Sequence, residues 1–566
     1  MPHLTCEKLS FSYPESPAKT IKEISFKVPA GSFCTLCGPT GSGKSTLLRM
    51  LKPELCPNGT LTGKRTIFER DIASFAPEES ASLIGYVMQN PVAQIVTDSV
   101  WHELAFGLEN LGVPTQEIRR RVAETAQYFG IQSWFNKKTS ELSGGQKQTL
   151  NLASIMVMQP KILVLDEPTS QLDPIAAKDF ITLLNRIHNE LGCTIILAEH
   201  RLDDVLPLSD VVLFLREGHL DFQGERQEFA RYVYSQAFEY RHYLPVATRI
   251  SFMAHDRVGK MHEENDVALT RFAFTVNEAR KNIETLATDI SVKQEARFMS
   301  AQETHAHYGT DSPRVLEAKD LWFRYKKDAE PVLQGLSLRV QKQTIHAIVG
   351  GNASGKTTLL HLLADGLKPL RGSVKISKGE RRGLLSQNPQ TMFIKDTVIE
   401  DLLEVAGNSA QAHTEALEQL KTFGIEHCSL SHPYDLSGGE MQKAALAKLM
   451  LINPSIVLLD EPTKGLDARA KQEFGTLLLR LKAQNKTIVM VSHDLDFVAQ
   501  YSDECSLIFN GGITSSGPSR SFFEHNTFYT TNAYRATRGL VEHCVVFEDY
   551  MRYIKALDKS EGKIER

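Results

Sequence analysis

Two glycine-rich segments end in a lysine followed by a hydroxyl residue. The pattern G-x-x-x-x-G-K-[ST] occurs at Gly38–Ser45 and again at Gly350–Thr357. Each copy follows an apolar run that predicts a strand and precedes a leucine-rich run that predicts a helix, which is the context that this pattern requires. Backbone N–H groups of such a loop, the positive end of the helix and the lysine charge together bind phosphate groups. The two segments therefore predict two phosphate-binding loops.

Within each loop we expect the lysine to contact nucleotide phosphates and the hydroxyl residue after it to ligate Mg²⁺. The second loop has Ala353 where the first has Gly41, which predicts a slightly stiffer loop that still binds nucleotide. The expected nucleotide contacts in the two loops are Gly38, Gly41, Gly43, Lys44, Ser45, Thr46, Gly350, Gly355, Lys356, Thr357 and Thr358.

Two further apolar runs end in an Asp-Glu pair. ILVLDE ends at Glu167 and IVLLDE ends at Glu461, and each run predicts a buried parallel strand with its carboxylates at the C-terminal edge of a sheet. We expect Asp166 and Asp460 to act on Mg²⁺, and the two glutamates to orient and polarise the attacking water. The alternative, an ordinary strand that ends in a charged turn, is disfavoured beside a phosphate loop.

These motifs belong to an internal repeat, because FSYPESPAKTIKEISFKV near the N-terminus corresponds to FRYKKDAEPVLQGLSLRV from Phe323. Tyr13 and Tyr325 each precede their loop lysine by 31 residues. From the loop lysine to a later glutamine the distance is 45 residues in the first copy and 31 in the second, and we expect this difference to fall in a loop-rich stretch. The repeat predicts two copies of one α/β domain.

LSGGQ at Leu142 and LSGGE at Leu436 put a serine and two glycines at a predicted helix start, where backbone donors are free to bind a phosphate oxygen. With these motifs added, the two copies resemble the nucleotide-binding domains of ABC ATPases over residues 1–225 and 314–517. The resemblance implies two P-loop NTPase domains in tandem, each with a RecA-like core sheet and a helical subdomain.

Two segments lie outside the resemblance. Residues 226–313 form a connector whose apolar and charged periodicity predicts a small accessory helical region rather than a flexible tether. Residues 518–566 form a C-terminal tail.

In that family the LSGG motif is called the signature. The signature serine and glycines of one domain close on ATP held by the phosphate loop of the other, which implies two composite sites. One would combine Lys44, Ser45, Gln89, Asp166, Glu167 and His200 with Ser437, Gly438 and Gly439. The other would combine Lys356, Thr357, Gln387, Asp460, Glu461 and His493 with Ser143, Gly144 and Gly145.

The resemblance also gives roles to single residues. His200 and His493 would contact the γ-phosphate, and the two glutamines would sense Mg²⁺ and the transport partner. Tyr13 and Tyr325 would stack on adenine, although isolated tyrosines also fit a core. Asp173 and Asp467 match the loop through which the two domains communicate. Because no catalytic residue is missing from either copy, we expect two competent sites, made unequal where Gln171 replaces Gly465.

The segment QNPVAQIVTDSVWHELAFGLEN from Gln89 resembles the ATPases of energy-coupling factor transporters, as do AEHRLDDV and FFEHNTFYTTNAYRATRG. That group imports vitamins and cobalt or nickel ions. The resemblance implies that closure of the two halves moves a transmembrane component, which tilts a substrate-capture subunit, at the cytoplasmic face of the membrane. Apolar residues after the glutamine, among them Val92, Ile95 and Phe106, fit either a docking groove for that component or the core of a helical subdomain.

Composition agrees with folded globular protein, at 42% hydrophobic and 23% charged residues. The formal net charge of -4 and the balanced connector give no reason to expect nucleic acid as a partner. No stretch approaches the roughly 20 apolar residues that cross a bilayer, so we expect a membrane role to come through a partner. Cys34 and Cys37 form a C-x-x-C pattern inside an apolar run, which favours core packing over redox or metal chemistry.

The alternative class is a tandem ABC ATPase that remodels ribosomes or DNA, and a third is a regulatory nucleotide switch. The glutamates of both Asp-Glu pairs favour ATP turnover over a switch.

Overall fold

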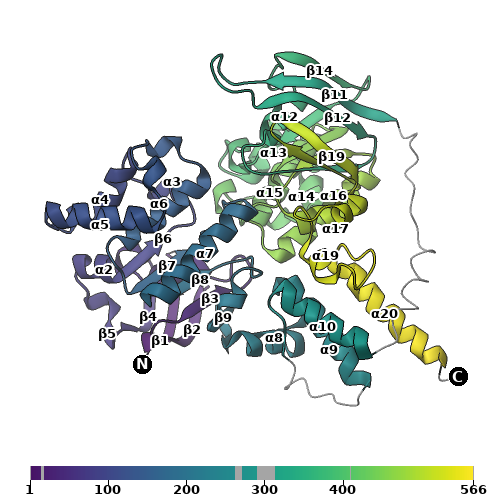
Figure 1. The fold of residues 1–566 in the computed structure, drawn as a ribbon. Helices are drawn as coiled ribbons and strands as arrows, with labels where there is room; N and C mark the ends of the chain where they lie inside the picture. The colour runs from purple at the N-terminus through teal and green to yellow at the C-terminus, as the bar shows by residue number, and fades with distance from the viewer. Residues whose placement is uncertain (1, 15–17, 262–270, 290–312, 408, 565–566) are drawn as a thin grey trace. The chain divides into compact units, whose positions relative to one another are not determined.

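The structure, a computed structural model, describes residues 2–14, 18–261, 271–289, 313–407 and 409–564 (Figure 1). It divides into two compact units, Met1–Pro245 and Val246–Arg566. Part of the predicted connector, residues 262–270 and 290–312, lies outside the described residues.

The first unit contains a six-stranded sheet with the order β10-β9-β3-β8-β7-β6, in which only the β9–β10 pair is antiparallel. Its strands are β3 (Phe33–Cys37), β6 (Ile84–Val87), β7 (Ile162–Asp166), β8 (Thr194–Ala198), β9 (Val211–Arg216) and β10 (His219–Gly224). Every residue of β3, β7 and β8 is buried, as expected for parallel strands covered on both faces. An antiparallel sheet with the order β2-β1-β4-β5 accompanies it, formed by β1 (Pro2–Ser12), β2 (Ile21–Pro29), β4 (Thr60–Ile67) and β5 (Arg70–Asp71).

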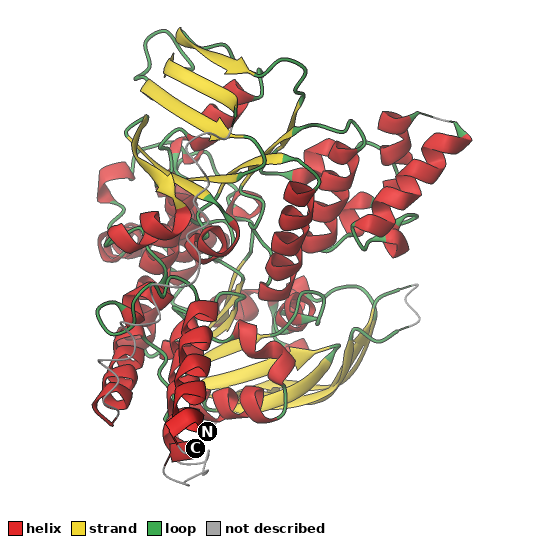
Figure 2. Ribbon diagram, turned by 90° about the vertical axis from the view of Figure 1, so that its right-hand side faces the viewer, coloured by secondary structure: helices red, strands yellow, loops and turns green. Residues whose placement is uncertain are grey.

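The helices of the first unit contribute to three clusters of buried apolar side chains. They are α1 (Lys44–Met50), α2 (Pro77–Leu83), α3 (Pro91–Gln94), α4 (Val100–Asn110), α5 (Thr115–Tyr128), α6 (Gly144–Met156), α7 (Pro174–Leu191) and α8 (Arg226–Ser235). Side chains of α4, α5 and α6 bury one another in a separate cluster that includes Leu104, Val122 and Leu150. This cluster is the core of the helical subdomain that the resemblance implied. Figure 2 shows the helices of the chain in red and its strands in yellow.

The extra length of the first copy is structured. Between β4 and β6 the first copy has β5, a 3-10 turn at Ile72–Ser74 and the helix α2. The expectation of a loop-rich stretch was therefore wrong here. The physical reason is that Ile72 and Phe75 are buried in the core of the first unit, so the insertion has apolar anchors of its own.

The second unit repeats the arrangement with the order β15-β16-β17-β13-β18-β19, parallel except for β18–β19. Its strands are β13 (Ile345–Val349), β15 (Arg382–Leu385), β16 (Ile456–Asp460), β17 (Thr487–Val491), β18 (Glu504–Phe509) and β19 (Gly512–Pro518). A three-stranded antiparallel sheet adds β11 (Arg314–Phe323), β12 (Leu333–Gln341) and β14 (Arg371–Ile376). The same strand order in both units confirms the predicted duplication of an α/β fold.

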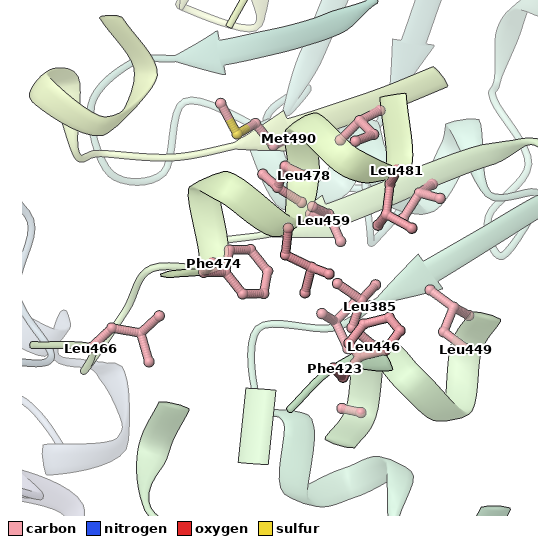
Figure 3. Close-up of a cluster of buried hydrophobic side chains, with 14 of the residues drawn as sticks. Leu385, Phe423, Leu446, Leu449, Leu459, Leu466, Phe474, Leu478, Leu481 and Met490 are labelled. Carbon is pink, nitrogen blue, oxygen red and sulfur yellow. The ribbon is translucent and has the colours of Figure 1, made fainter. Parts of the chain in front are cut away.

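The main core of the second unit joins sheet and helices. Figure 3 shows Leu459 of β16 and Met490 of β17 among Phe423, Leu446 and Phe474, which come from neighbouring helical segments. The helices of this part are α12 (Lys356–Leu363), α13 (Val398–Ala406), α14 (Ala410–Thr422), α15 (Gly438–Met450), α16 (Ala468–Ala483), α17 (Leu495–Tyr501) and α18 (Ser519–His525). Burial of so many large apolar side chains holds the carboxylate-bearing end of β16 in place.

Part of the connector and part of the tail form one structure in the second unit. Two connector helices, α9 (Val246–Met261) and α10 (Val276–Asp289), pack with two tail helices, α19 (Asn532–Thr537) and α20 (Phe547–Ile564) (Figure 1). Their shared core holds Ile250, Ile283, Ala536, Phe547 and Tyr550, and we call it the accessory helical module. Segments more than 200 residues apart thus bury one another's apolar faces.

Cys34 and Cys37 lie in β3 with both thiols buried and without a disulfide. Burial raises the pKa of Cys37 to about 12, so the thiol is neutral and acts as a small apolar side chain. Among the described residues, no helix is both long enough and apolar enough to cross a membrane.

Candidate functional site

The first phosphate loop leads from β3 to α1. Gly43, at its end, has a φ of 99°, and a Cβ there would lie 2.7 Å from Cδ1 of Ile21, so both conformation and space require glycine. The ammonium of Lys44 donates to the carbonyls of Gly38 and Pro39, each at 3.0 Å. The lysine is therefore folded over its own loop.

The second loop repeats these contacts. Gly355 has a φ of 100°, and Nζ of Lys356 donates to the carbonyls of Gly350 at 3.2 Å and Gly351 at 2.8 Å. Ala353 has a φ of 58° where Gly41 has 78°, so the alanine takes the glycine conformation at some cost in strain. The hydroxyls of Ser42 and Ser354 are buried without a hydrogen-bond partner. Both loops thus hold unused polar groups, which fits the binding of a polar ligand.

The aspartates of the two Asp-Glu pairs meet the hydroxyls that follow the loop lysines. Oγ of Ser45 donates to Asp166 at 2.9 Å, and Oγ1 of Thr357 donates to Asp460 at 3.2 Å. Burial raises the pKa of both aspartates, partly offset by these hydrogen bonds and reinforced by the adjacent glutamate. A hydroxyl beside a buried carboxylate is an oxygen donor set of the kind that suits Mg²⁺.

The glutamates of the same pairs face the predicted histidines. Oε1 of Glu167 lies 2.7 Å from Nε2 of His200, and Oε1 of Glu461 lies 3.0 Å from Nε2 of His493. Both glutamates have a positive φ, 45° at Glu167 and 50° at Glu461. Non-glycine residues rarely adopt this conformation, and it concentrates at functional sites. No sequence pattern indicated it.

The two glutamines differ between the copies. Nε2 of Gln89 donates to Oε2 of Glu167 at 2.9 Å. Gln387 is exposed, and within the described part of the chain it makes no corresponding bond to Glu461. The structure therefore brings Gln89 into the first site and leaves Gln387 beside the second.

The signature serines begin helices. Ser143 caps α6 through a reciprocal pair of hydrogen bonds with Gln146, and Ser437 caps α15 in the same way with Glu440. The second glycine of each following pair packs closely, since a Cβ on Gly145 would lie 3.1 Å from Ala176 and one on Gly439 would lie 3.2 Å from Ala470. Within each unit, the signature serine caps the N-terminus of the helix that follows it.

The predicted adenine-stacking tyrosines stand next to their loops. The hydroxyls of Tyr13 and Thr46 lie 3.0 Å apart, as do those of Tyr325 and Thr358. Tyr325 is 61% exposed, so it is not a core residue. This exposure is compatible with stacking.

The communication-loop aspartates are helix caps. Oδ1 of Asp173 accepts from the backbone at the start of α7, and Oδ1 of Asp467 does so for α16. Gly465 has a φ of 72°, whereas the corresponding Gln171 is not in the left-handed region. The two loops therefore differ in backbone conformation.

Sequence reasoning missed two charged residues at these sites. Glu199 is 3% exposed, accepts from both the hydroxyl and the N–H of Thr169, and accepts from the N–H of His200. Burial raises its pKa. The second copy has Ser492 at this position, and there the N–H of His493 donates to Glu461 instead.

The second missed residue is Lys464, which follows the Asp-Glu pair of the second copy where the first has Ser170. Burial lowers the pKa of Lys464, and the charges of Glu461 and Asp460 oppose the shift. Two differences between the copies could have indicated these residues: AEH in the first copy is VSH in the second, and PTS in the first is PTK in the second. The first site thus has an added carboxylate and the second an added ammonium.

One protein family and several known proteins match this chain. The family described as ABC transporter matches residues 21–170 and 333–464. A Bacillus cereus protein provisionally named an ABC transporter ATP-binding protein is 38% identical over 561 residues, covering 97% of both chains. A Bacillus subtilis protein, YkoD, provisionally named an HMP/thiamine import ATP-binding protein, is 30% identical and also covers 97% of both chains.

Among solved structures, cbiO1 from Clostridium perfringens, described as part of the ABC transporter complex cbiONQ, is 31% identical. It covers 43% of this chain and 98% of its own, with a TM-score of 0.37. The full-length similarity to the Bacillus proteins establishes the family. This chain belongs to the ABC transporter ATP-binding proteins, an ATPase family whose members hydrolyse ATP.

Proposed function

We propose that this chain is the ATP-hydrolysing subunit of a membrane importer of the energy-coupling factor type, for a vitamin or another micronutrient. The observation that carries the energising role is the matched Glu–His arrangement beside each phosphate loop, at 2.7 Å and 3.0 Å. The importer class rests on the segment after Gln89 and on the Bacillus subtilis relative named for HMP/thiamine import.

In this proposal each residue set does one task. Lys44 and Lys356 turn from their own loop carbonyls to the phosphate oxygens of ATP, and Tyr13 and Tyr325 stack on adenine. The glutamate of each site orients a water molecule for attack on the γ-phosphorus; as the new P–O bond forms, the bond to the bridging oxygen of ADP breaks.

The histidine beside each glutamate holds the γ-phosphate. Mg²⁺ held by Ser45, Asp166 and Gln89, or by Thr357, Asp460 and Gln387, would neutralise the charge on the phosphates.

We further propose that the sites are composite. Ser143, Gly144 and Gly145 would complete the site of the second phosphate loop, and Ser437, Gly438 and Gly439 that of the first. Release of each serine from its capping partner would free its hydroxyl for the γ-phosphate. One chain would then pair its own two ATPase domains and supply both sites.

Partners and location follow from the importer class. The transmembrane component would dock on apolar residues after each loop glutamine, where Val92 is 63% exposed and Ile394 is 69% exposed. Ile95 and Phe106 are partly buried, so Val92 is the better candidate for direct contact. The substrate-capture subunit would bind the nutrient, and this chain would lie peripherally on the cytoplasmic face of the membrane.

The test is capture of the transmembrane component by the tagged chain from detergent-solubilised membranes of its own organism. We expect that component to co-purify with wild type and with Ile175→Asp, which changes an equally exposed aliphatic residue on α7. Val92→Asp should lose it. Co-purification of ribosomes or DNA instead would support the alternative class of a nucleoprotein-remodelling ATPase.

A further inference from the structure

A histidine, a cysteine and a glutamate meet just before the second signature helix. His427 and Cys428 lie in a 3-10 turn at Glu426–Cys428, and Glu440 lies in the first turn of α15. One candidate ligand atom from each side chain lies within 4.8 Å of the other two. Among the residues that the structure describes, this is the one such group, and we call it the His-Cys-Glu cluster.

The contacts inside the cluster are close. Nε2 of His427 lies 3.1 Å from Oε1 of Glu440. Sγ of Cys428 lies within 4.8 Å of a carboxylate oxygen of Glu440, and Cys428 is 4% exposed, whereas the His427 side chain is largely open to solvent. An ion could therefore enter from the histidine side and reach a sheltered sulfur.

Helix capping does not explain the cluster. Oε2 of Glu440 accepts from the N–H of Ser437 at 3.0 Å and from its hydroxyl at 2.6 Å. In the first copy the neutral Gln146 performs the same capping of Ser143. A carboxylate is thus more than the cap needs, and neither His427 nor Cys428 takes part in it.

The first copy has different residues at the positions of this cluster. Counting back from each signature serine, His427 corresponds to Ser133 and Cys428 to Trp134. Trp134 is a buried core residue, and none of the three first-copy residues is a usual ligand for a transition metal. All three positions carry ligand-type side chains in the second copy only.

We propose that His427, Cys428 and Glu440 form a binding site for a divalent transition metal ion of borderline softness, such as Zn²⁺. Thiolate, imidazole and carboxylate are the ligands that Zn²⁺ takes in proteins, and three of them leave one position for water. The thiol proton is released to solvent when the sulfur binds the ion. The ion shares Glu440 with Ser437, so it sits one side chain away from the second signature.

Titration of the nucleotide-free full-length chain with Co²⁺ tests the site, because cobalt bound to a thiolate has a near-ultraviolet charge-transfer band. We expect one equivalent to produce this band and one equivalent of Zn²⁺ to abolish it. His427→Ser and Glu440→Gln, which install the first-copy residues, should each weaken binding about tenfold or more. Cys428→Ser should remove the band.

Two controls keep the result specific. His413→Ser changes an exposed histidine on α14, and Cys56→Ser changes a partly exposed cysteine of the first unit; both should keep the band and the affinity of wild type. Absence of a thiolate band in the wild-type chain would overturn the proposal. So would unchanged affinity in His427→Ser, whose exposed position allows the variant to fold.

Discussion

Nε2 of His200 lies 2.7 Å from Oε1 of Glu167, and the same atoms of His493 and Glu461 lie 3.0 Å apart in the other copy. Both glutamates follow a fully buried strand and hold a positive φ. The strained backbone turns each carboxylate toward its histidine. Two copies of one strained arrangement predict two working sites.

Replacement of either glutamate by glutamine should therefore lower ATP turnover. We expect Glu167→Gln and Glu461→Gln each to remove about half of the steady-state rate or more, and the double variant to lose about 10²-fold or more, because each removes the group that polarises water. Phosphate release at saturating Mg·ATP measures this. Glu78→Gln, on the exposed face of α2, is the control; single variants with wholly unchanged turnover would refute two competent sites.

The buried Glu199 predicts a difference between the sites. It binds the N–H of His200, and Ser492 replaces it in the second copy. We expect Glu199→Ser to lower turnover several-fold when combined with Glu461→Gln, because only the first site is then active. Combined with Glu167→Gln it should change little, and an equal effect in both backgrounds would contradict a local role at His200.

Burial raises the pKa of Asp166 above its ordinary value. A carboxyl group whose pKa is higher in the folded than in the unfolded state binds more protons when the chain is folded. Its ionisation therefore destabilises the fold. This destabilisation is absent below about pH 4 and grows as pH rises through the folded-state pKa. Asp166→Asn should therefore raise the melting temperature of the nucleotide-free chain at pH 7. Each kcal/mol corresponds to about 2–4 °C for a unit of this size.

Differential scanning calorimetry between pH 4 and pH 8 measures this effect. The gain should shrink toward pH 4, and Asp179→Asn on α7 should show no such trend. A gain that stays constant with pH would rule out titration of Asp166 as its cause.

A buried ion pair holds the segment after Gln387. Nζ of Lys448 lies 2.8 Å from Oδ1 of Asp401, and Asp401 also accepts from the N–H groups of Ile394 and Lys395. Asp401→Ala leaves the ammonium buried without its nearest anion, and we expect a loss of about 3–5 kcal/mol in the free energy of unfolding. Urea unfolding of the full chain measures it.

Removal of both charges should cost less. Asp401→Ala combined with Lys448→Met should recover part of the stability, since no buried charge is then left unpaired. Arg339→Ala breaks an exposed pair with Glu317 and should cost less than about 1 kcal/mol. A similar loss in Asp401→Ala and Arg339→Ala would show that burial of the Lys448 pair is unimportant.

The sequence by itself determined the duplication, the fold class and the residues at the end of each motif. Local patterns suffice for these, because a glycine-rich loop between strand and helix and an apolar run ending in Asp-Glu each specify their own structure. The sequence also predicts that Ser45 and Asp166 both act on Mg²⁺, whereas the hydrogen bond between them is seen only in the structure.

Only the tertiary structure decided what depends on packing between distant segments. Helices α9 and α10 bury their apolar faces against α19 and α20, and no local pattern tells which amphipathic helices will meet. The positive φ of Glu167, the burial of Glu199 and the meeting of Cys428 with Glu440 likewise arise from neighbours supplied by other elements. A side chain's type is written in the sequence, whereas its partner is set by the packing that brings the two together.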